Sequence, residues 1–74
     1  MIERNISKHI VLKDLTIKFG ISKLNKVNPP ILFVIDKSKN FLGTLTDGDI
    51  RRFILTNQSL EKKIIKITNK NLFS

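Results

Sequence analysis

Four residues near the middle of the chain have the types and spacing to bind an anion. Thr46 and Asp49 lie three positions apart at the expected start of a helix, and Arg51 and Arg52 follow within one turn. Side chains at this spacing can both reach a ligand over the helix N-terminus, where free N–H groups and positive potential favour phosphate. The arginines can add charge-assisted hydrogen bonds to phosphate oxygens. The pattern therefore indicates a small anion-binding site.

The same segment also fits an ordinary helix start. Thr46 is a suitable N-cap, and Asp49 can reach back to it in the manner of a capping box. Gly48 would relieve a tight turn. Capping and ligand contact can hold together, so both interpretations stay open.

No other cluster predicts catalysis or metal binding. The chain has no Cys and a single His, His9, which we interpret as a surface or half-buried residue. Asp47 could begin a calcium loop, but position 12 of that loop is Gln58 where an EF-hand needs Glu. We therefore expect no enzymatic activity in this module and no required cofactor.

The elements before this segment predict a small sheet. Residues 9–12 favour a short strand. A helix capped by Asp14 or Thr16 should follow and end before the Asn-Pro-Pro sequence at 28–30. Residues 31–35 form a continuous apolar run, which is typical of a strand buried on both faces.

A polar turn at residues 36–40 should return the chain into a strand at 41–46, which forms an antiparallel hairpin. The next helix carries an apolar stripe of Ile50, Phe53 and Ile54. Ser59 can cap a last short helix. The expected fold class is α/β (α+β), with the order strand-helix-strand-strand-helix, a small mixed sheet and helices on one side.

Length and charge limit the possible functions. The chain has 74 residues, enough for one domain, and a domain of this size buries only about 60% of its unfolded surface. A partner chain is therefore expected to add stability. Fourteen basic and six acidic residues leave a net charge of +8, which attracts phosphates or nucleic acid, although the lysines form no dense tract. No membrane span or signal peptide is expected, and we interpret the chain as cytoplasmic.

Residues 31–52 resemble the core of the cystathionine-β-synthase-type (CBS) domain. The pattern is an apolar strand ending in Asp36, a hairpin, and then Gly43, Thr46 and Asp49 at the family's spacing. The resemblance covers roughly residues 8–68. Residues 46–52 are similar to CBS pairs attached to sugar-phosphate isomerases or sugar-nucleotide nucleotidyltransferases. The resemblance to the CBS domain implies that residues 1–74 form one CBS-type domain. This domain would be a fragment of a CBS pair (Bateman module) in a longer protein.

This resemblance implies a regulatory module that binds adenosine-type nucleotides such as AMP, ADP or ATP. In the family, the Asp position accepts hydrogen bonds from ribose hydroxyls and the Thr position donates to phosphate. The implied binding residues in this chain are Thr46, Asp47, Asp49, Arg51, Arg52, Pro30, Ile31 and Leu12. The chain departs from the family at Pro30 and Ile31, where members that grip phosphate often carry basic or polar side chains. Val11, Leu12 and Ile31 could line an adenine pocket, but core packing explains them equally well.

Two other functions stay open. A ligand-free structural module for oligomerisation would need only an apolar surface, and the expected partner is a second CBS unit or a second copy in a homodimer. A basic nucleic-acid-binding domain would need aromatic side chains that stack on bases. Phe33 and Phe53 are expected in the core, so nucleic-acid binding is the weaker alternative.

Overall fold

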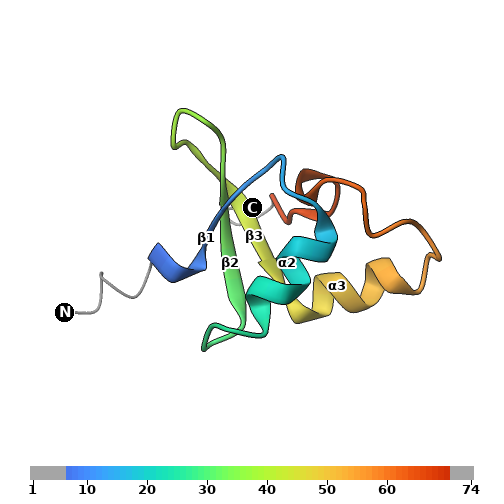
Figure 1. Ribbon diagram of the computed structural model, residues 1–74. Coiled ribbons are helices and arrows are strands. Elements are labelled where there is room, and N and C mark those ends of the chain that lie inside the picture. Colours follow the sequence, from blue (N-terminus) through green and yellow to red (C-terminus); the bar gives the residue numbers. More distant parts are fainter. Residues whose placement is uncertain (1–6, 71–74) are drawn as a thin grey trace.

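A three-stranded mixed sheet, covered on one face by helices, forms the framework of the molecule (Figure 1). The structure is a computed structural model, and it describes residues 7–70. The expected order of strands and helices is confirmed. In chain order the elements are η1 (Ser7–His9), β1 (Ile10–Leu12), α2 (Ile17–Leu24), β2 (Ile31–Ile35), β3 (Phe41–Thr46), α3 (Asp47–Ile54) and η2 (Ile64–Ile67).

Strand β2 lies at the centre of the sheet because its neighbours in sequence approach it from opposite sides. β1 pairs with β2 in parallel, across the connection made by α2, and β3 returns antiparallel after the hairpin. In this register Ile10 pairs with Phe33, and Ile31 pairs with Thr46. The starts of β1 and β2 and the end of β3 therefore lie at the same end of the sheet.

The hairpin turn is held by one carboxylate. Asp36 Oδ1 accepts hydrogen bonds from the backbone N–H groups of Ser38, at 2.8 Å, and Asn40, at 2.9 Å. The side-chain amide of Asn40 donates to the other carboxylate oxygen of Asp36 at 3.1 Å. These bonds to Asn40, together with that from Ser38, lower the pKa of Asp36 from its ordinary value of 3.8.

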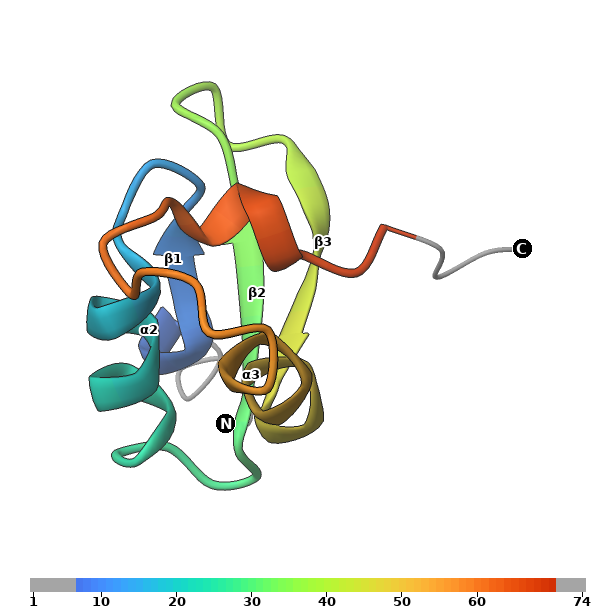
Figure 2. The ribbon, with the colours of Figure 1, turned by 90° about the vertical axis from the view of Figure 1, so that its right-hand side faces the viewer.

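The core lies between the sheet and the layer formed by α2, α3 and η2, which Figure 2 shows in front of the strands. Buried apolar side chains come from every part of that layer and from the sheet, and each contributes about 1.5–3 kcal/mol through burial. The core consists of Val11, Ile17, Leu24, Leu32, Val34, Leu45, Ile50, Phe53 and Ile64. Of the apolar stripe expected on the helix after Thr46, Ile50 and Phe53 are in this core, whereas Ile54 is 52% exposed.

The other face of the sheet carries no covering layer among residues 7–70, so the prediction that β2 is buried on both faces was wrong. Only Leu32 and Val34 are fully buried, while Ile31, Phe33 and Ile35 are half-buried. A strand alternates its side chains between faces, and every second residue of β2 therefore points to this open face. Phe33, expected in the core, lies there as well.

The segment that contains η2 is bound tightly to the rest of the fold. Its backbone bonds to the start of α2, since Ile17 N–H donates to the Lys62 carbonyl at 2.8 Å.

Farther on, Thr44 and Asn69 exchange two backbone hydrogen bonds, of 2.8 and 3.1 Å, along the edge of β3. A Cβ on Gly43 would lie only 2.3 Å from the Asn69 carbonyl oxygen, so this approach requires glycine. Ser59 accepts a bond from Glu61 N–H, but the short helix after it begins only at Ile64.

Candidate functional site

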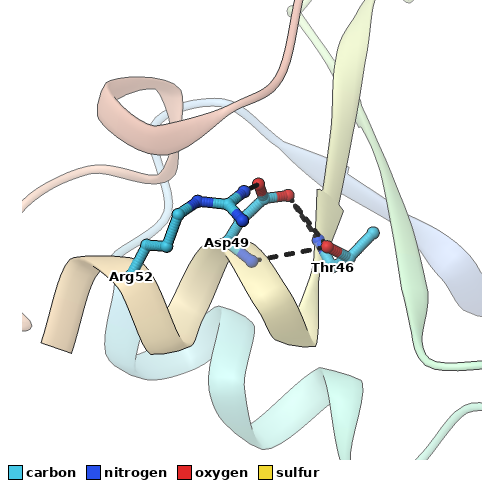
Figure 3. Close-up of polar contacts among 3 residues, drawn as sticks. All are labelled: Thr46, Asp49 and Arg52. Carbon is cyan, nitrogen blue, oxygen red and sulfur yellow. Dashed lines mark hydrogen bonds and ion pairs between the residues drawn. The ribbon is translucent and has the colours of Figure 1, made fainter. Parts of the chain in front are cut away.

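The junction between β3 and α3 forms the capping box that the sequence predicted (Figure 3). Thr46 has an extended backbone, and its hydroxyl accepts from the Asp49 N–H at 3.4 Å. In return, Asp49 Oδ2 accepts from the Thr46 N–H at 2.9 Å and from the Thr46 hydroxyl at 3.1 Å. Such a cap stabilises a helix by about 1 kcal/mol. The reciprocal bonds fix Asp49 against the end of β3.

Arg52 occupies the remaining oxygen of the same carboxylate. Its Nη2 donates to Asp49 Oδ1 from one turn farther along α3. The Asp49 side chain is only 9% exposed, whereas that of Arg52 is 71% exposed. Both oxygens of a nearly buried carboxylate are therefore engaged, one by the strand–helix junction and one by a long, solvent-exposed side chain.

Arg51 forms a separate ion pair on α3. Its Nε lies 3.1 Å from Asp47 Oδ2, and both side chains are mostly exposed, at 79% and 58%. Exposed pairs at this helical spacing contribute only about 0.3–0.5 kcal/mol. The structure thus divides the four charged residues between positions 47 and 52 into two pairs, and the pair of Asp49 and Arg52 lines a hollow.

This hollow has a volume of about 330 Å³ and opens between α3 and the C-terminal segment. Its lining residues are Asp49, Arg52, Phe53, Thr56, Gln58 and Ile67. The size is at the low end for small-molecule sites. The sequence interpretation missed Thr56 and Gln58, although the steps from Asp49 to Arg52, Phe53 and Thr56 follow one face of a helix and could have indicated it.

The charges along α3 bear on where an anion could rest. Asp47 and Asp49 lie in the first turn, and Arg51 and Arg52 lie in the last turn. This order already complements the helix dipole. A phosphate placed directly over the start of α3 would meet two carboxylates, so the guanidinium of Arg52 is the better partner for it.

The remaining predicted site residues separate into two groups. Ile31 pairs with Thr46, so it and the exposed Pro30 lie at the same end of the sheet as the capping box. Leu12 pairs instead with Ile35, four residues along β2 from Ile31, which places it about 13 Å from that end. The structure therefore does not bring Leu12 together with Thr46.

His9 lies at the end of the sheet that holds Thr46. It is buried, 8% exposed, which corrects its assignment as a surface or half-buried residue. Its Nδ1 lies 2.7 Å from the Ile31 carbonyl oxygen, and since a carbonyl only accepts, Nδ1 carries the proton. The centre of the ring lies 6.0 Å from that of the Phe33 ring. A hollow of about 260 Å³ beside it is lined by Lys8, His9, Lys26, Val27 and Asn28.

The open face of the sheet carries a third hollow of about 370 Å³, lined by Ile10, Phe33, Ile35 and Phe41. The rings of Phe33 and Phe41 lie 6.3 Å apart, centre to centre. Leu12 and Phe41 remain 44% and 46% exposed. Because every side chain that lines this hollow is apolar, it is a surface for packing and not for polar chemistry.

Two features, a metal-binding cluster and a membrane-spanning helix, are absent from the described part of the chain. No group of three His, Cys, Asp or Glu side chains among residues 7–70 is arranged to hold a metal ion. In the same range, no helix is both long enough and apolar enough to cross a bilayer.

Solved structures share this architecture. The chain resembles a CBS domain protein from Streptococcus pneumoniae TIGR4 with a TM-score of 0.75, at 18% identity over 84% of this chain and 46% of that one. An uncharacterized conserved protein from Pyrococcus horikoshii gives a TM-score of 0.75 at 24% identity, over 88% of this chain and 50% of that chain. Staphylococcus aureus OpuCA gives 0.70 at 17% identity, over 86% and 52%.

The chain therefore has the fold of a single CBS-type unit, and it spans about half the length of each of these structures. No protein-family model matches the chain, and no curated protein matches it.

Proposed function

We propose that this chain is one unit of a regulatory CBS pair that senses an adenosine-type nucleotide: AMP, ADP or ATP. The observation that carries the proposal is that the Asp49 carboxylate and the Arg52 guanidinium line the same hollow. A carboxylate accepts from hydroxyl groups, and a guanidinium donates to phosphate. A ligand with both a ribose and a phosphate therefore matches the pair. The module itself performs no catalysis.

We further propose that the unit belongs to a sugar-nucleotide nucleotidyltransferase or a sugar-phosphate isomerase. The support is the likeness of residues 46–52 to the CBS pairs of those enzymes. A nucleotide that binds one state of the host enzyme more tightly would shift the balance between states by that difference in affinity.

Calorimetric titration with AMP, ADP and ATP tests nucleotide binding. We expect saturable binding to the wild-type chain and at least a tenfold loss, about 1.4 kcal/mol, in Asp49→Asn. Asp14→Asn is the matched control, because it removes an exposed carboxylate that pairs with Lys13 and Lys63 away from the hollow. Far-UV circular dichroism establishes that each variant is folded. Equal affinity in Asp49→Asn and the wild type would contradict the assignment of the site.

We propose that a second CBS unit, or a second copy of this chain, covers the open sheet face. The support is the apolar hollow around Phe33 and Phe41, together with the twofold greater length of the similar structures. Burying such side chains is worth about 25 cal/mol for each Å² removed from water. A lone unit leaves that stabilisation unused.

Size-exclusion chromatography with light scattering tests this pairing. The wild-type chain should be dimeric at high micromolar concentration, and Phe41→Lys should be monomeric. Leu55→Lys is the control, because Leu55 is an exposed apolar residue, 85% exposed, at the end of α3. A wild-type chain that stays monomeric would count heavily against the second copy.

A second candidate function is a ligand-free module for oligomerisation. The observation in its favour is that both oxygens of Asp49 already have donors within the chain, so the residue has a structural role without any ligand. If none of AMP, ADP and ATP binds and the chain forms a stable dimer, the result supports this function. Affinity for oligonucleotides with a steep salt dependence would instead select nucleic-acid binding.

A further inference from the structure

The three donors to Asp49 differ in how easily they can leave. Two of them belong to Thr46, its backbone N–H and its hydroxyl, and are held where β3 meets α3. The third is the guanidinium of Arg52, at the end of a side chain that is 71% exposed. The Asp49 side chain is only 9% exposed and Arg52 lies against its Oδ1, so a ribose hydroxyl must compete with the guanidinium for this oxygen and gains most when the guanidinium withdraws. Arg52 is the one donor that can do so without opening the helix.

Arg52 in turn needs an anion when it leaves Asp49. A guanidinium gains more from a phosphate than from water, because its parallel N–H groups match two phosphate oxygens. Arg52 lines the same hollow as Thr56 and Gln58, so its side chain can turn within that space and remain at the site. The exchange therefore favours a ligand that supplies a hydroxyl for Asp49 and a phosphate for Arg52 at once.

We propose that Arg52 is an exchangeable partner of Asp49 and makes the site select phosphorylated over unphosphorylated nucleosides. A nucleotide binds by drawing Arg52 onto its phosphate while a ribose hydroxyl takes the vacated Asp49 oxygen. An unphosphorylated nucleoside has no phosphate to accept hydrogen bonds from Arg52. Its ribose hydroxyl must therefore compete with Arg52 for Asp49. This inference rests on the proposed nucleotide function and adds the residue that sets its selectivity.

The ratio of the dissociation constants of adenosine and AMP measures this selectivity. For the wild-type chain we expect a ratio of at least about ten, which corresponds to one charge-assisted contact. In Arg52→Met the guanidinium is absent, so AMP should bind more weakly and adenosine as well as before or better. The ratio should then fall below about three. Met is a good helix former, so α3 should persist.

Lys18→Met is the matched control. It removes one positive charge from an exposed position on a helix, α2, that does not line the hollow. Both proteins therefore lose the same net charge, and a general electrostatic effect would weaken AMP binding equally in the two. A change of ratio in Arg52→Met alone isolates the contact with Asp49.

The outcomes distinguish this inference from the function on which it rests. If AMP binds and Arg52→Met keeps the wild-type ratio, or weakens both ligands by the same factor, the exchange is wrong while nucleotide sensing stands. If neither ligand binds the wild type or Arg52→Met at millimolar concentration, both fail. Binding of adenosine to Arg52→Met but not to the wild type would support the exchange directly.

Discussion

The two α-helices among residues 7–70 begin with the same N-cap, a threonine, and differ in the residue that lies three positions after it. Thr16 and Thr46 each have an extended backbone, and each hydroxyl accepts from the N–H three residues on, at 3.1 Å in α2 and 3.4 Å in α3. The third residue is Phe19 in α2, 44% exposed, and Asp49 in α3, which is buried. Only α3 therefore has the returning bonds of a capping box.

The surroundings of the two starts also differ. At α2, the C-terminal segment closes over the helix, since the N–H groups of Ile17 and Lys18 donate to the carbonyls of Lys62 and Leu60. No backbone oxygen among residues 7–70 closes over Asp47 and Gly48 in this way. A capped helix start is thus a closed structural element in one place and the wall of a hollow in the other, and the difference comes from what packs across it.

Asp49→Ala should have the largest effect on stability. It removes the acceptor of two Thr46 bonds and leaves Arg52 without its partner, so we expect a loss of about 2–3 kcal/mol in the free energy of unfolding. Phe19→Ala changes the equivalent position of α2 and should cost less than about 1 kcal/mol, because Phe19 is half exposed. Urea unfolding followed by circular dichroism measures both. Equal losses would remove the energetic distinction between the two helix starts.

Thr46→Ala should destabilise the chain more than Thr16→Ala. Loss of an N-cap costs about 0.5–2 kcal/mol. We expect Thr46 near the upper end, since its hydroxyl also donates to Asp49, and Thr16 near the lower end. The same unfolding experiment compares them. A larger loss in Thr16→Ala would show that the closed start of α2 depends more on its cap than the box of α3 does.

Asp36 extends the comparison to a carboxylate that is held chiefly by hydrogen bonds from Asn40 and Ser38, with the charge of Lys13 as a minor contribution. Its pKa is lowered in the folded chain, chiefly by the bond from Asn40 N–H, so its contribution is present above the ordinary pKa of 3.8. The contribution is lost as the pH falls through the lower, folded pKa. We expect the thermal midpoint of unfolding to fall as the pH is lowered below about 4. In Asp36→Asn it should fall less steeply with pH. Identical pH profiles would show that the turn does not depend on this charge.

The smallest effect should come from Phe19→Glu, which supplies α2 with the acidic residue that it lacks. A carboxylate in the first turn of a helix is favourable by about 0.3–1 kcal/mol, and the loss of half-exposed apolar surface offsets part of this gain. We therefore expect a change of a few tenths of a kcal/mol, in the stabilising direction. Thermal unfolding at low salt measures it, and raising the salt concentration should diminish it.

Much of the local structure could be predicted from the sequence. The caps at Thr16 and Thr46, the turn begun by Asp36 and the order of the elements all follow from residues within a few positions of one another. The capping box of Asp49 was expected as one of two interpretations and is confirmed. Its role toward a ligand stays a prediction.

The choice of partners within the site could not be predicted in the same way. Arg51 and Arg52 both lie one turn from an acidic residue, and either spacing allows an ion pair. Packing decided that Arg52 shares the hollow with Asp49 while Arg51 faces solvent with Asp47. The alternation of β2 was missed for a related reason: an apolar run does not reveal whether a second layer covers its outer face.

The sequence by itself determined the helix caps and the hairpin turn, because backbone geometry brings residues three or four positions apart together wherever the segment lies. Tertiary structure alone decided which end of the sheet each residue occupies, that His9 is buried and bonded to the Ile31 carbonyl, and that Leu12 lies far from Thr46. Those placements depend on strand register and on helices packing across the sheet. They bring His9 to Ile31 and Leu12 to Ile35, which are 22 and 23 positions apart, and no local pattern encodes such proximity.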